Sequence, residues 1–267
     1  MKVAVLGAGP TAMMAALAVE RQGHTPVIFA RERIKSEVNE DMYLQRPLPD
    51  VPGVEAGHPD SVIQYIRRGT SEGYAEKCYG YASAPVSWDR IQWGFGDAWW
   101  LEDIYDKLFD RFVGNIMEHF IDPLSIGLIT RNYAMTLSTL PAPMLCPNHC
   151  TFSFVPTTLV RVRNPNWSPQ LSRNEMIYNG MPDGGWFRCS RLRGWITFEY
   201  AGEPPEDEVP AGAVVLRGKK FTGNSCSCNP TVARIGRWAQ WERGILNHHA
   251  YEQTLGVLAS AGLGKVA

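Results

Sequence analysis

The first thirty residues place a strand, a glycine-rich turn and a helix in immediate succession, and this order constrains the fold more than any other feature. Residues 3–6 form a short apolar run, typical of a parallel strand buried on both faces. The run ends in Gly-Ala-Gly-Pro-Thr-Ala at residues 7–12, and residues 13–21 are rich in Ala, Met and Leu, which favour a helix. Pro26 then opens a second strand over residues 27–30. The stretch predicts a β-α-β unit and an α/β fold.

Each small residue of the turn has a role in binding a dinucleotide. Gly7 permits the tight turn, Gly9 lets the backbone approach a pyrophosphate, and Ala12 lets helix and strand pack closely. Pro10 and Thr11 belong to the turn, and the N-terminus of the helix that follows presents free N–H groups and the positive end of its dipole to phosphate. A strand–helix turn without a ligand is the alternative. We predict that this turn binds the pyrophosphate of a dinucleotide.

The acidic residue that usually binds the adenosine ribose is missing. It should fall near Ala30, at the end of the second strand, where the sequence reads Ala-Arg-Glu-Arg. Arg31 and Arg33 favour NADP, because an arginine at this place holds the 2′-phosphate. With FAD, Glu32 or backbone groups would replace the carboxylate and the arginines would face the phosphates. In a third interpretation both arginines are solvated at the strand end. These residues leave the choice open.

The rest of the chain is not a repeated β-α-β array. Periodicity and turn signals predict a further set of elements. They are a proline-rich excursion at 36–60, a strand or short helix at 61–68, a helix at 99–120, a strand from 135 into a proline-bounded loop, strands at 151–162, 175–178 and 195–200, turns at 179–188, an exposed loop at 202–212 and a final helix at 241–258.

Composition gives no strong signal for a nucleic-acid or membrane partner, and it leaves a local basic groove open. The 267 residues carry a formal net charge of -1, so no global field favours nucleic acid or an anionic membrane. No apolar run approaches the roughly 20 residues that span a bilayer. Gly7, Gly9 and Pro10 break the first apolar run where a signal peptide would continue. We expect a cytoplasmic protein with no membrane or nucleic-acid partner, and the sequence does not specify an oligomeric state.

The six cysteines are expected to be thiols in a reducing compartment. Cys146, His149 and Cys150, together with Cys226 and Cys228, contain enough ligand types for a zinc site. Their spacings match no common zinc pattern, and neighbouring prolines indicate simple loops. We therefore predict no bound metal.

Several segments resemble known flavoproteins. Residues 2–33 resemble the adenylate-binding start of FAD-dependent oxidoreductases, and TLSTLPAPML (136–145) resembles the returning strand of their amine-oxidase-like branch. Residues 177–200 are similar to a sheet segment of UDP-galactopyranose mutases, and residues 233–258 to their C-terminal flavin-binding turn and helix. Their order along the chain agrees with that architecture. The resemblance therefore implies an FAD site, with NADP as the alternative.

The resemblance also implies further cofactor contacts and a domain division. Pro141 would lie near the flavin, and Gly236, Arg237 and Trp238 would form the returning turn that reaches the flavin or its pyrophosphate. The fold implied is a discontinuous Rossmann-like FAD-binding domain, completed by the C-terminal segment, with a smaller mixed-sheet and helical substrate domain. We assign residues 1–45, 125–150 and 213–267 to the first domain and residues 46–124 and 151–212 to a reduced second domain.

Four residues are candidates for the catalytic pocket. Lys77 lies in an aromatic-rich segment and would hold a water or an anionic group, unless it is a surface lysine. Arg188 and Arg191 lie in the mutase-like segment, where a planar guanidinium suits carboxylate or phosphate and surface ion pairing is the alternative. Trp238 would stack on a ring or fill core.

The expected function is FAD-dependent oxidation of a C–N or C–O bond in a small molecule or in a modified group on a macromolecule. The sugar-diphosphate arginine motif of the mutases is absent, which counts against that activity. The alternatives are a non-redox flavin enzyme such as a mutase or lyase, an NADP-dependent reductase and a non-catalytic dinucleotide-binding module.

Overall fold

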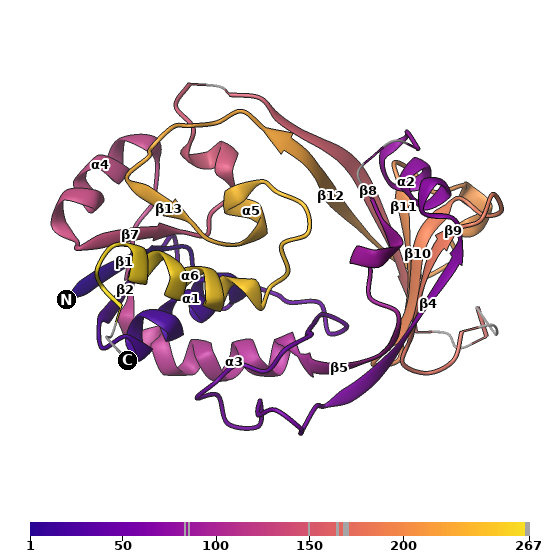
Figure 1. The fold of residues 1–267 in the computed structure, drawn as a ribbon, viewed down its shortest axis with the longest axis horizontal. Helices are drawn as coiled ribbons and strands as arrows, with labels where there is room; N and C mark the ends of the chain where they lie inside the picture. The colour runs from indigo at the N-terminus through magenta and orange to yellow at the C-terminus, as the bar shows by residue number, and fades with distance from the viewer. Residues whose placement is uncertain (83, 85, 149, 164–165, 168–170, 265–267) are drawn as a thin grey trace. The chain divides into compact units, whose positions relative to one another are not determined.

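The computed structural model forms two compact units (Figure 1). It describes residues 1–82, 84, 86–148, 150–163, 166–167 and 171–264. Unit 1 consists of Met1–His58, Trp99–Ser153 and Gly223–Ala267, and unit 2 consists of Pro59–Ala98 and Phe154–Thr222. No helix among the described residues has the length and apolar character that crossing a membrane requires.

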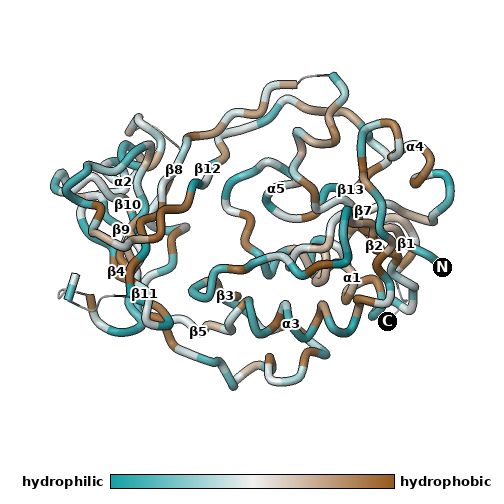
Figure 2. The backbone as a smooth tube through the Cα atoms, turned by 180° about the vertical axis from the view of Figure 1, so that it is seen from behind, coloured by the Kyte–Doolittle hydropathy of each residue, from teal (hydrophilic) through white to brown (hydrophobic). Residues whose placement is uncertain are grey.

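Unit 1 is built on a parallel sheet with the strand order β13-β7-β1-β2-β6. The five strands are β1 (Lys2–Leu6), β2 (Thr25–Ala30), β6 (Ile116–Glu118), β7 (Met135–Ser138) and β13 (Val232–Arg234). Side chains of β1 alternate between two hydrophobic clusters, with Val3 and Val5 on one face and Ala4 and Leu6 on the other. The central strands are accordingly hydrophobic in Figure 2. Burial on both faces explains why residues 3–6 show no polar alternation.

Helices cover both faces of this sheet. One hydrophobic cluster joins the sheet to α1 (Pro10–Arg21), α3 (Leu101–Phe112) and α6 (His249–Ser260), and both α3 and α6 pack on α1. The cluster on the opposite face includes α4 (Pro123–Asn132) and the 3-10 turn η3 (Ala142–Leu145). Unit 1 therefore has three layers, and α1 is the helix that the others enclose (Figure 1).

Unit 2 is built on a mixed sheet. The order is β12-β8-β11-β10-β9-β4-β5-β3, in which β4 and β9 are parallel. The strands are β3 (Tyr43–Leu44), β4 (Ser61–Gly69), β5 (Gly94–Trp100), β8 (Phe152–Val162), β9 (Glu175–Gly180), β10 (Trp186–Leu192), β11 (Trp195–Ala201) and β12 (Val214–Asn224). Strand β3 pairs with Trp99 and Trp100, the end of β5 that belongs to unit 1. Helix α2 (Ser71–Tyr79) packs on β9, β10 and β11.

The helix predicted over residues 99–120 is too long. Trp99 and Trp100 end β5, α3 stops at Phe112, and the 3-10 turn η2 (Val113–Asn115) leads into β6. The four-residue spacing of apolar side chains is satisfied inside α3 by Ile104, Leu108 and Phe112, which are buried. Beyond them Ile116 is buried because it pairs with Ile28 in the parallel sheet, a long-range contact that produces the same spacing.

The final helix is shorter than predicted, beginning at His249 rather than at Trp241. Trp241 adopts a left-handed conformation (φ 53°) that ends the short helix α5 (Gly236–Gln240), and Gly244 is also left-handed (φ 78°). Strand β12 was not predicted, because an acidic loop dominates the sequence before it, and β10 was implied only by the resemblance of residues 177–200 to a sheet segment.

The two units differ from the sequence-based domain assignment over residues 46–58, 99–124, 151–153 and 213–222. The first three segments were assigned to the substrate domain but belong to unit 1, and residues 213–222, assigned to the FAD-binding domain, belong to unit 2. The longest of these segments, residues 99–124, contains α3 and β6. The reason is that α3 buries its apolar side against α1 and β6 adds an edge to the parallel sheet. Excursions through unit 2 therefore occupy residues 59–98 and 154–222.

We predict that acidification destabilises the protein through His248, the buried N-cap residue of α6. Burial, His249 and Arg46 lower the pKa of His248 to about 4, from 6.5 in the unfolded chain. Between these values the unfolded chain binds the extra proton, so the free energy of unfolding falls as the pH is lowered through this window. Urea unfolding at pH 7 and pH 5 should show a loss of about 2 kcal/mol from this residue.

Replacing His248 with Gln should remove most of that loss, because the side chain no longer gains a proton on unfolding. The matched control is His58→Gln, since His58 is exposed. An equal acid-induced loss in the wild type and in His248→Gln would contradict the assignment.

Candidate functional site

The glycine turn begins where β1 ends, and its first residue tolerates no side chain. Gly7 has φ +106°, and its N–H donates to the Phe29 carbonyl over 2.8 Å. On the other side, the N–H of Thr139 donates to the Leu6 carbonyl over 3.0 Å. A Cβ on Gly7 would lie 2.6 Å from Thr139 Oγ1. The turn is thus fixed between the ends of β2 and β7, and both the φ angle and the packing require glycine.

The second glycine has a different environment, with free space beside it. Gly9 is the N-cap of α1, and its carbonyl accepts from the N–H groups of Ala12 and Met13 at 2.9 and 3.1 Å. The N–H groups of Gly9 and Thr11 have no acceptor among the described residues. A Cβ added to Gly9 would have no atom within 4 Å. Open space, unpaired donors and the positive end of a helix dipole meet here, and together they suit a phosphate.

Tyr105 of α3 supports the glycine turn by a hydrogen bond, and the sequence did not predict this role. Its hydroxyl donates to the Ala8 carbonyl over 2.8 Å and accepts from the Ser36 N–H over 3.0 Å. The side chain is buried in α3. A tyrosine on the apolar side of a predicted helix indicates that its buried hydroxyl needs a hydrogen-bond partner. The sequence does not indicate which carbonyl is that partner.

The C-terminal segment returns to the start of α1. After β13, the N–H of Ile235 donates to the Ser138 carbonyl over 2.8 Å. Gly236 follows with φ +81°, and a Cβ on it would lie 2.5 Å from Thr11 Cγ2. The N–H of Gly236 donates to Gln253 Oε1 over 2.9 Å. The returning turn therefore packs directly on the glycine turn, while Gln253 holds the N–H that the resemblance assigned to the cofactor.

These contacts lie at one edge of the parallel sheet. The strands β1 and β7 are neighbours, and the chain leaves them in opposite directions, towards β2 and towards β13. Ligands of open α/β sheets bind at such a switch point, outside the carboxyl ends of the strands. Pro141 follows β7 at this edge as the N-cap of η3, and Arg237 and Trp238 continue from Gly236 in α5.

The arginines after β2 have separate roles. Arg33 donates to the Ile116 carbonyl over 2.6 Å and so fastens β6 to the segment that follows β2. Arg31 is 79% exposed, and its Nε lies 3.7 Å from Glu32 Oε1. Arg31 is the guanidinium at this strand end that a bound phosphate can reach without breaking a main-chain contact.

A carboxylate does lie beside the place where the ribose-binding acid is missing. Ala30 at the end of β2 pairs in register with Glu118 at the end of β6. Side chains paired in adjacent parallel strands share a face of the sheet. The exposed Glu118 thus supplies a carboxylate next to the alanine, contributed by a strand about ninety residues later in the chain. A local sequence count could not locate it.

Lys77, a catalytic candidate in unit 2, makes main-chain hydrogen bonds. Its Nζ donates to the carbonyls of Asp183 and Gly184, each over 2.7 Å. Burial lowers the pKa of Lys77. The lysine therefore fastens α2 to the turn between β9 and β10.

The two arginine candidates are also engaged. Arg188 binds Glu199 on the neighbouring strand, with Nε 2.6 Å from Oε1 and Nη2 bonded to the same oxygen. Burial acts to lower the pKa of Arg188, and Glu199 raises it above its ordinary value. Arg191 donates to the Leu171 carbonyl over 3.0 Å. Trp238, in unit 1, is 44% exposed and meets Trp241 edge-on at 6.0 Å.

Lys220 in β12 is a reactive-group candidate that sequence reasoning missed. Its Nζ lies 3.2 Å from Cys78 Sγ, 3.5 Å from Tyr74 Oη and 3.7 Å from the centre of the Phe187 ring. Burial lowers the pKa of Lys220. The sequence offers Lys219 and Lys220 side by side, and only the pairing of β12 determines which one faces Cys78 and Phe187.

Four cysteines gather in unit 1, which the prediction of simple loops did not anticipate. The Sγ atoms of Cys146, Cys150, Cys226 and Cys228 all lie within 4.8 Å of one another. His149, the other residue of the predicted set, lies outside the described residues.

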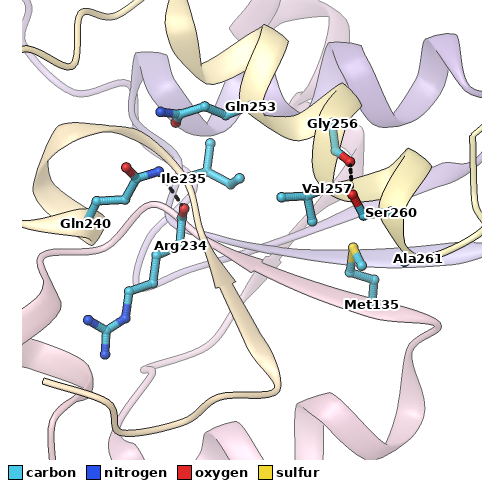
Figure 3. Close-up of a pocket in the computed structure, with 9 residues that line it drawn as sticks. All are labelled: Met135, Arg234, Ile235, Gln240, Gln253, Gly256, Val257, Ser260 and Ala261. Atoms are coloured by element: carbon cyan, nitrogen blue, oxygen red, sulfur yellow. Dashed lines mark hydrogen bonds between the residues drawn. The ribbon is translucent and has the colours of Figure 1, made fainter.

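A separate pocket of about 470 Å³ lies between β13 and α6 (Figure 3). Its lining includes Ile235, Gln253 and Val257, and the Gln240 side chain closes one end by donating to the Arg234 carbonyl. None of the predicted cofactor residues is among the described residues that line it. The pocket is thus distinct from the space beside Gly9.

Comparison with known proteins gives a clear answer for the fold. No family model matches the sequence, and no curated protein is significantly similar to it. A reduced UDP-galactopyranose mutase superposes with a TM-score of 0.57 at 11% identity, covering 99% of this chain and 96% of that one. The p-nitrophenol 4-monooxygenase of Pseudomonas putida gives 0.54 at 12%, covering 97% and 78%.

A third similar structure is aklavinone-11 hydroxylase in a ternary complex with FAD and aklavinone. It gives a TM-score of 0.56 at 12% identity and covers 98% of this chain and 62% of that one. Likeness at these identities concerns the fold. The chain has the α/β fold of these proteins, which confirms the Rossmann-like architecture predicted from the sequence.

Proposed function

We propose that the protein is an FAD-dependent enzyme that binds the cofactor at the glycine turn. The observation that carries the proposal is the open space beside Gly9, where an added Cβ would meet no atom within 4 Å, together with the N–H groups of Gly9 and Thr11, which have no acceptor among the described residues. The residues fit a pyrophosphate, because a phosphate oxygen accepts from both donors and the helix dipole favours its charge. Proteins of the same fold include a hydroxylase solved with FAD.

Several residues of this chain would hold the cofactor. Gly7 and Ala12 keep the turn tight, and Gly236 closes on Thr11 from the C-terminal segment. Arg31, which is exposed at the end of β2, would meet a phosphate, and Pro141, Arg237 and Trp238 would contact the flavin half. When bound, FAD supplies hydride acceptance from a carbon next to nitrogen or oxygen.

The reaction that we propose is oxidation of a C–N or C–O bond, in a small molecule or in a modified group on a macromolecule. Proteins of the same fold include monooxygenases and hydroxylases, which supports redox use of the flavin. The mutase of the same fold keeps a non-redox reaction as the alternative. Trp238 is the exposed aromatic side chain closest in sequence to the turn at Gly236. We favour it as the residue of unit 1 that contacts the substrate.

NADP binding is the second candidate, favoured by the exposure of Arg31. Its guanidinium lies just beyond β2, where a 2′-phosphate would be recognised, and its partner Glu32 is exposed as well. The two candidates make different demands on the returning segment: FAD uses the turn at Gly236, whereas an NADP site has no need of it.

We expect the purified full-length protein to be yellow and to release FAD, rather than FMN, on denaturation. The absorbance spectrum and chromatography of the released cofactor measure this directly. Colourless protein that fails to take up added FAD but binds NADPH would contradict the FAD proposal and support an NADP site.

Replacing Gly9 with Val should weaken FAD binding by about 100-fold or more, because the branched side chain fills the space of the pyrophosphate. Gly9 has a backbone that valine tolerates (φ −74°), so the variant is expected to fold. Flavin fluorescence titration of soluble protein gives the affinity. Gly223→Val is the matched control, since a Cβ there also meets no atom within 4 Å. Wild-type affinity in folded Gly9→Val protein would remove the turn from the site.

Oxidation and non-redox chemistry are separated by mixing substrate with the FAD-loaded enzyme without oxygen. We expect a small amine- or hydroxyl-bearing substrate to bleach the oxidised flavin, because electrons from the broken C–H bond stay on it. A screen of such compounds followed by visible spectroscopy makes the measurement. Turnover by dithionite-reduced enzyme alone, without an oxidised product, would establish the non-redox alternative.

A further inference from the structure

We propose that Cys146, Cys150, Cys226 and Cys228 bind one zinc ion in a tetrahedral tetrathiolate site. The site lies wholly in unit 1 and uses none of the proposed cofactor contacts. It therefore stands independently of the proposed function.

The sulfur geometry carries the proposal. The Sγ atom of Cys228 lies 3.7 Å from that of Cys146 and 3.8 Å from that of Cys150, and all four Sγ atoms lie within 4.8 Å of one another. Zinc binds thiolate at about 2.3 Å, so a regular tetrahedron places its sulfurs about 3.8 Å apart. Two separate segments thus bring four sulfurs to the corners of a zinc site.

Other roles for the four cysteines fit less well. A disulfide joins two sulfurs at about 2.05 Å, much closer than the 3.7 and 3.8 Å seen here. An iron–sulfur cluster distributes its cysteines over several irons, whereas these four Sγ atoms lie within 4.8 Å of one another, a spacing that suits one ion. Four cysteines with no oxygen ligand suit zinc rather than calcium or magnesium.

The surroundings offset part of the charge that four thiolates would bring. The Cys150 N–H donates to Cys146 Sγ over 3.4 Å, and Asn148 Nδ2 donates to Cys228 Sγ over 3.4 Å. The guanidinium of Arg234 lies 3.0 Å from Cys226 Sγ. Such outer hydrogen bonds orient metal ligands and stabilise their anionic form. One cation and two further donors are therefore aimed at the sulfurs.

Arg234 also shows what the ion would hold in place. Its side chain extends away from the pocket of Figure 3 and donates to the Cys226 and Cys228 carbonyls at 3.4 and 3.1 Å. Its own carbonyl, at the end of β13, accepts from Gln240 Nε2 over 2.9 Å. Zinc would tie the loop after η3 to the segment that enters β13, and so fix the strand from which the Gly236 turn continues.

The test is metal analysis of the full-length protein, purified without chelator or metal-affinity resin. We expect about one zinc per chain by mass spectrometry of the elements. Protein expressed in cobalt-supplemented medium should show the d–d bands of tetrahedral cobalt thiolate at wavelengths beyond flavin absorption. Zinc removal with a mercurial and a chelator should lower the unfolding temperature.

The paired variants separate this site from adventitious binding. Cys226→Ser/Cys228→Ser should reduce bound zinc to less than about a tenth per chain, because only two thiolates remain. Cys189→Ala, which removes a buried cysteine of unit 2, should keep the full amount. If the double variant does not fold, the cobalt spectrum of the wild type decides. Absence of zinc and of cobalt–thiolate bands, a disulfide among these cysteines, or iron on the same sulfurs would each overturn the proposal.

Discussion

The structure of unit 1 depends on a close approach of three chain segments at one edge of its sheet. The turn after β1, the segment after β7 and the turn after β13 meet there with no room for side chains at two points. A Cβ at Gly7 would collide with Thr139, and a Cβ at Gly236 would collide with Thr11. Both glycines also have positive φ, so packing and backbone conformation impose the same choice of residue.

That close approach determines where open space remains at the N-terminus of α1. Protein atoms pack closely against Gly7 and Gly236. The space that stays open is beside Gly9, at the N-terminus of a buried twelve-residue helix. Tyr105 holds the same turn through the Ala8 carbonyl. The geometry that we propose for phosphate binding is thus preorganised by protein contacts, and binding need not order the loop.

The glycine turn and α1 could be predicted because their signals are local: an apolar run, small residues at fixed offsets and a helix-forming stretch. The parallel fold followed from the same unit. By contrast, Ile116 continues the apolar spacing of α3 but lies in β6, since a strand and a helix can share a short run of such spacing. The left-handed Trp241 likewise interrupts a segment whose composition is helical.

The partners of the candidate side chains could not be predicted, because they come from strands that are far apart in the sequence and pair only in the folded protein. Glu118 comes to lie beside Ala30 only because β6 joins the edge of the sheet. Lys77 and Arg188, attractive as catalytic groups in the sequence, are held by carbonyls and by Glu199 that only the folded sheet supplies. The cysteine pairs were separated by a whole excursion of the chain, so their spacing resembled no compact zinc motif.

The hydrogen bond from the Ser225 N–H to the Thr151 carbonyl, 3.3 Å long, has a consequence for how this chain can vary. Residues 154–222 leave and re-enter unit 1 at neighbouring points, close to the four cysteines. This hydrogen bond joins the two ends of the excursion. The entropy cost of bringing such ends together rises only with the logarithm of the length of the segment between them. Loops within the excursion can therefore change in length at a small entropic cost, whereas its strands cannot be exchanged alone, because β9 pairs with β4 of residues 59–98.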